Sequence, residues 1–75
     1  MKIGSDEPTT EELDMLRNQY LNKKVIVKYK IRGDFHEKIG LLENIASSTF
    51  LLRTSEHEVI NIPYLFRPEI EEAKQ

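Results

Sequence analysis

The chain has 75 residues, no cysteine and a formal net charge of −2. A chain of this length forms one domain and removes only about 60% of its unfolded surface from water, so its core is too small to enclose a catalytic cleft. Without cysteine it has no disulfide bonds or thiolate metal sites, and no segment approaches the roughly 20 apolar residues that span a bilayer or forms a signal peptide, which together predict a cytoplasmic protein.

The charges are grouped along the chain. Residues 1–20 carry two basic and five acidic side chains, residues 21–53 carry seven and three, and residues 54–75 carry two and five. A basic centre between acidic ends is typical of a local cationic patch. The alternative is that these charges only keep the surface soluble, and acidic ends repel a phosphate backbone unless they point away from it.

The first predicted element is a helix from about residue 10 to residue 21, after a mobile lead formed by residues 1–8. Thr9 or Thr10 can accept hydrogen bonds from the free amides of a first helical turn. Glu12 follows Thr9 by three residues and completes a capping box.

One face of this helix is apolar, since Leu13, Leu16 and Tyr20 recur at helical spacing with Met15 beside them. The face is expected to cover an open core. The alternative is a detachable helix that binds a protein partner through its acidic side chains, Glu11, Glu12 and Asp14.

From Lys24 the apolar spacing changes to two, which predicts a strand. Val25, Val27 and Tyr29 share its core face. The other face carries a basic row interrupted by Ile26, whose members are candidate phosphate contacts: Lys24, Lys28, Lys30 and Arg32.

Further strands follow, the next of them in "HEKIGLLENI". Gly33 and Asp34 predict a turn, and Gly40 predicts a sharp bend or a close backbone approach within the next strand. Two further strands are expected in "TFLLRT" and "EVINI", and pairing is expected to break or reach an edge at Pro63, which has no N–H group to donate. The segment "YLF" predicts a short last strand or a 3₁₀ turn, and "PEIEEAKQ" a short, frayed closing helix.

The predicted fold is mainly β: an N-terminal helix followed by a small, strongly bent antiparallel barrel of four or five strands. The expected organisation is a mobile lead (1–8), a single barrel domain that includes the helix (9–68), and a frayed tail (69–75).

The side chains offer little for catalysis. His36 and His57 are the only imidazoles, and no nucleophile, base and orienting group can be assigned around them. No metal, cofactor or enzymatic activity is therefore expected. Tyr64 and Phe66 are candidate stacking surfaces for nucleic-acid bases.

The stretch from residue 21 to residue 52 resembles the first sequence motif of the Sm-like family, whose members are small five-stranded barrels with an N-terminal helix that often assemble as RNA-binding rings. The apolar and glycine positions that match are Leu21, Val25, Val27, Gly33, Gly40, Leu42 and Ile45. The resemblance implies the fold. It does not imply the family's uridine pocket, because Ala46 and Phe50 replace its aspartate and asparagine and "IPY" replaces its second motif.

Two further likenesses widen the choice. An acidic helix before such a barrel is similar to the layout of the Rho inhibitor Rof, which binds a nucleic-acid-handling protein. The layout is also similar to that of SH3-like barrels, which mostly bind peptides or proteins.

The expected function is a non-enzymatic binding module in RNA or DNA transactions that contacts nucleic acid through the basic strand face. The alternative is an adaptor or inhibitor that grips a nucleic-acid-handling protein through its acidic helix and an exposed strand edge. Free strand edges would also allow copies of the chain to assemble.

Overall fold

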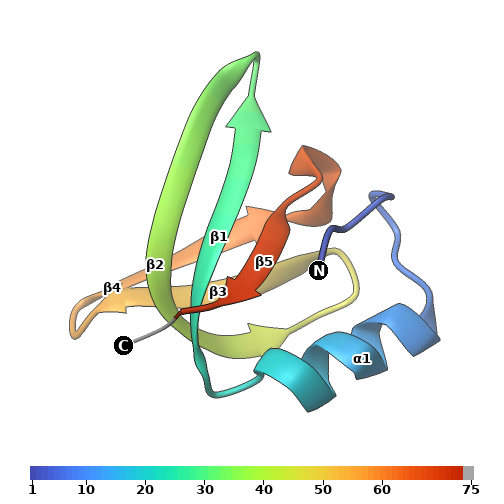
Figure 1. Ribbon diagram of the computed structural model, residues 1–75, viewed down its shortest axis with the longest axis horizontal. Helices are drawn as coiled ribbons and strands as arrows, with labels where there is room; N and C mark the ends of the chain where they lie inside the picture. Colours follow the sequence, from blue (N-terminus) through green and yellow to red (C-terminus); the bar gives the residue numbers. More distant parts are fainter. Residues whose placement is uncertain (74–75) are drawn as a thin grey trace.

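The computed structural model describes residues 1–73 and contains one α-helix, five β-strands and one 3₁₀ turn (Figure 1). The last two residues of the expected frayed tail, 74 and 75, lie outside the described residues. No helix within residues 1–73 is long and apolar enough to cross a membrane. The elements in chain order are α1 (Thr10–Tyr20), β1 (Lys24–Ile31), β2 (Asp34–Ile45), β3 (Thr49–Ser55), β4 (Glu58–Pro63), η1 (Tyr64–Phe66) and β5 (Glu69–Glu72).

The five strands form one sheet in the order β4-β3-β2-β1-β5, and all neighbours are antiparallel. This confirms the prediction of a mainly β chain in which one helix precedes antiparallel strands. The 12-residue strand β2 curves through the molecule, so that the β1–β2 hairpin projects at the end opposite to α1 (Figure 1). The sheet ends at β4 on one side and at β5 on the other.

The helix forms as its sequence predicts. The Thr9 side chain accepts from the backbone of Glu12, and the Glu12 carboxylate accepts from the backbone of Thr9, so the capping box is present. Leu13 and Leu16 are buried in the core, whereas Met15 is 48% exposed and lies outside the apolar face.

A two-residue turn joins β1 to β2. Arg32 and Gly33 have φ values of 51° and 85°, the left-handed pair that a tight hairpin requires. The expected turn at Gly33 and Asp34 is thus one residue off, because Asp34 already pairs with Ile31. Arg32 consequently belongs to the turn rather than to the strand.

Gly40 marks a close approach between strands, as predicted. A Cβ atom at this position would lie 2.8 Å from the carbonyl carbon of Arg53 in β3, closer than such atoms can approach. Only glycine therefore allows β2 to pass this close to β3.

The predicted closing helix is wrong, because residues 69–72 form strand β5 on the free side of β1. Ile70 is fully buried there, opposite Val27. A helix over this segment would have had little apolar surface to bury, while the edge of β1 offers hydrogen-bond partners to every second residue. The frayed tail is thus ordered as far as Glu72.

The first three residues of the predicted lead pack against the fold. Ile3 is fully buried, and its N–H group donates to the carbonyl of Pro68 at 2.9 Å. The carbonyl of Met1 accepts from the N–H group of Ile70 at 2.7 Å, and the backbones of Lys2 and Glu69 form an isolated antiparallel β-bridge. Residues 1–3 thereby cover the outer edge of β5.

Candidate functional site

A cleft lies next to the distal half of β1, where the β1–β2 hairpin extends past the end of β5 and η1 packs beside it (Figure 1). Its volume is about 830 Å³, which is within the usual range for a ligand site. The lining residues come from the N-terminal segment, β1, the hairpin turn, the start of β2, η1 with the residue after it, and the start of β5: Lys2, Lys28, Tyr29, Lys30, Ile31, Arg32, Phe35, Leu65, Phe66, Arg67 and Glu69.

Positive charge dominates this cleft. Five of its side chains are cationic and only Glu69 is acidic; the cations are Lys2, Lys28, Lys30, Arg32 and Arg67. The two ion pairs within residues 1–73 lie elsewhere, in α1 and between β2 and β3. The cleft cations are therefore not neutralised by a direct ion pair, and an anionic ligand can use them.

Exposed apolar groups accompany the cations. The side chain of Phe35 is 71% exposed, and Leu65 is 61% exposed. The ammonium group of Lys30 lies 4.9 Å from the centre of the Phe35 ring, a cation–π contact across the hairpin. An aromatic ring left this exposed beside lysines can stack with a planar ligand.

Phe66 enters the cleft at the end of a row of three stacked rings. Tyr29 lies between His36 and Phe66, with ring centres 5.4 Å and 6.0 Å away. Tyr29 is buried, as predicted, and Phe66 is half-buried. Phe66, predicted as a stacking surface, lines the cleft, and Tyr29 stacks on its ring.

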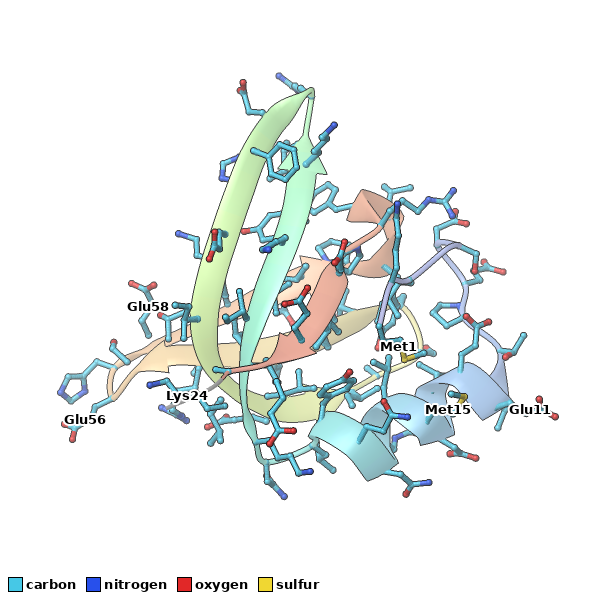
Figure 2. The ribbon with its side chains drawn as sticks, viewed as in Figure 1. Met1, Glu11, Met15, Lys24, Glu56 and Glu58 are labelled. Atoms are coloured by element: carbon cyan, nitrogen blue, oxygen red, sulfur yellow. The ribbon has the colours of Figure 1, made fainter. Side chains whose placement is uncertain are left out.

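The side chains of the basic row do not all lie in the cleft. Lys28, Lys30 and Arg32 line the cleft, whereas Lys24 lies at the other end of β1, well away from the hairpin tip (Figure 2). Lys28 also has an acidic neighbour on each adjacent strand, since it is paired with Glu37 in β2 and with Glu69 in β5. The acidic C-terminal segment thus lies beside the row instead of pointing away from it.

The prediction of Tyr64 as an exposed stacking surface is wrong. Its side chain is fully buried, and its hydroxyl donates to the carbonyl of Ala46 at 2.8 Å. Burial raises the pKa of Tyr64 to about 12, and the nearby charge of Arg17 opposes this only in part. After Pro63 the chain turns inward, so the first ring of "YLF" joins the core.

The acidic side chains of α1 are mostly engaged. Glu12 belongs to the capping box, and Asp14 pairs with Arg17 at 3.1 Å. Glu11 is exposed and points away from the sheet (Figure 2). The helix lies at the end of the molecule opposite to the hairpin tip (Figure 1), so these carboxylates do not belong to the cleft.

Seven residues that line the cleft were not predicted as site residues: Lys2, Tyr29, Ile31, Phe35, Leu65, Arg67 and Glu69. Lys2 lies in the segment predicted as a mobile lead, and Arg67 lies between two predicted elements, "YLF" and "PEIEEAKQ", so neither could be placed. Phe35 did carry a signal, because a residue two positions after a two-residue hairpin turn lies opposite the residue two positions before it, here Lys30.

Residues 1–73 bring together no group of three His, Asp or Glu side chains that could hold a metal ion. Comparison with protein-family models, curated proteins and solved structures found no match for the chain.

Proposed function

We propose that the protein is a non-enzymatic binding module for single-stranded RNA or DNA, which it holds in the cleft beside β1. The observation that carries this proposal is the joint presence of five cations and the exposed ring of Phe35 in one cleft. Proteins that bind single strands combine a positive groove for the phosphates with aromatic rings for the bases. A duplex hides its bases, so the cleft should prefer a single strand.

The order of elements supports placing the chain among the Sm-like or SH3-like small barrels. One helix followed by five antiparallel strands in one sheet is the layout that the resemblance implies. The contact surface differs from the expected one: it is the cleft at the hairpin rather than the whole outer face of β1.

Salt dependence is the first test. Three or four phosphate contacts, about the number that the cleft cations permit, predict a loss of about 20- to 50-fold in affinity as salt rises from about 50 mM to about 200 mM. Fluorescence anisotropy of a labelled oligonucleotide measures this change. No binding at the lower salt concentration would overturn the proposal.

Paired variants of equal charge locate the site. The double variant Lys30→Glu, Arg32→Glu is expected to abolish binding, because both side chains line the cleft. Lys24→Glu combined with Lys38→Glu changes the net charge equally, but both residues lie outside the cleft, and about normal affinity is expected. Phe35→Ala should weaken binding about tenfold or more through lost stacking. An equal loss in the two double variants would point to non-specific charge attraction.

The protein-binding alternative keeps one structural observation in its favour: β4 ends the sheet, and no other strand of the described part of the chain pairs with its outer edge. An extended peptide can add to such an edge. Its acidic contacts are less well supported, because Glu12 and Asp14 already have partners within the helix. A protein ligand lost on Glu11→Lys, with no oligonucleotide bound at low salt, would favour this function.

A further inference from the structure

The backbone of β1 has a fixed orientation along its length. The Lys24 carbonyl accepts from the N–H group of Ala73 at 2.9 Å, so the polar backbone groups of Lys24 face β5. In an antiparallel ladder this direction repeats at every second residue. Ile26, Lys28 and Lys30 therefore also turn their N–H and C=O groups toward the β5 side.

The ladder between β1 and β5 stops one step too early to include Lys30. Its last pair is Lys28 with Glu69, and continuing the same register would place Arg67 opposite Lys30. Arg67 cannot take that place, because it is left-handed with a φ of 52° and its N–H group donates to the carbonyl of Tyr64 at 2.9 Å. The 3₁₀ turn thus keeps Arg67 out of the position in which it would pair with Lys30.

The backbone of Lys30 consequently faces the cleft without a strand partner among residues 1–73. One donor and one acceptor lie side by side there. Cations surround them, and the ring of Phe35 is on the cross-strand neighbour of the same residue.

We propose that the N–H and C=O groups of Lys30 form hydrogen bonds with the Watson–Crick edge of an unpaired base held in the cleft. This inference rests on the proposed function and adds the means by which the base is read. Unpaired bases in single strands are commonly recognised by stacking together with hydrogen bonds along this edge. Each base presents a donor next to an acceptor there, so the site distinguishes accessible edges from paired ones.

The test compares a short oligothymidylate with the same oligonucleotide carrying N3-methylthymine. Methylation removes the donor at N3 but leaves the ring, the phosphates and the charge unchanged. We expect the methylated strand to bind about tenfold more weakly, since a paired donor and acceptor discriminate by about that factor or more. Binding is measured by anisotropy at low salt.

Amide hydrogen exchange of the whole chain supplies a second readout. The Lys30 amide should exchange rapidly in the free protein and about tenfold or more slowly in the complex with oligothymidylate. The Lys28 amide, already in the ladder with β5, is the control and should change little.

The outcomes separate the two proposals. Equal binding of both oligonucleotides, or an unchanged Lys30 amide in the saturated complex, would overturn the base-reading inference while the proposed function stands. Failure of both oligonucleotides to bind at low salt would overturn both proposals.

Discussion

Gly40 shows how one residue decides the path of a strand. The absence of a side chain lets β2 pass directly against the backbone of β3 at Arg53, and this contact is made of main-chain atoms that cannot move aside singly. The residue type was informative in the sequence, since a glycine inside a strand often marks a bend or a close backbone contact. What it lies against was not readable from the sequence, because that depends on the register of β3.

Replacing Gly40 with alanine is expected to destabilise the protein by about 1–3 kcal/mol, through overpacking against β3. Urea unfolding followed by circular dichroism measures the change. Gly4→Ala is the matched control: a Cβ there meets nothing within 4 Å, and a change within about 0.5 kcal/mol is expected. A Gly40→Ala variant as stable as the control would contradict the close approach.

At the scale of elements, the spacing of apolar residues predicts those segments that show a regular period. The helix and β1 follow from spacings of near four and of two, and the capping box set the start of α1, while β2 to β4 were expected from short runs between turn residues. The failure came at β5, where four residues contain a single buried apolar side chain, Ile70, and show no period. Its strand conformation is imposed by the free edge of β1, a tertiary effect that no local pattern encodes.

A strand at residues 69–72 and a frayed tail predict different effects of mutation on the free energy of unfolding. Ile70→Ala should cost about 2–5 kcal/mol of unfolding free energy, because the side chain is fully buried in the core. Glu71→Ala removes an exposed side chain from the same strand and should change the free energy by less than about 0.5 kcal/mol. If the two variants unfold at the same urea concentration, β5 does not form in solution.

At the scale of the whole molecule, the two sheet edges are unequal. The outer edge of β4 has no further strand among residues 1–73, whereas residues 1–3 lie along β5 through backbone hydrogen bonds at Ile70 and Pro68. A ring built by pairing β4 of one copy with β5 of the next would have to displace this segment. The candidate cleft was only partly predictable at this scale: the sequence supplied three of its five cations, and the fold brought Lys2 and Arg67 to join them.

We therefore expect sedimentation at high protein concentration to show a monomer. Ile3→Pro removes the N–H group that donates to Pro68 and should loosen the cover of β5, so this variant is expected to self-associate. Ile3→Ala loses core packing but keeps the N–H group, and it should remain monomeric. A wild-type protein that sediments as a ring would contradict the protective role of residues 1–3.

The left-handed turn at Arg67 has a consequence for how this surface can change over evolutionary time. The gap opposite Lys30 is made by the course of the main chain, so exchanging the lysines or the ring beside it does not by itself fill it. Related proteins could thus carry their lysines or their aromatic ring at other positions and keep the same gap. A small insertion that extended β5 by two residues would fill the gap opposite Lys30, although every charged group would stay in place.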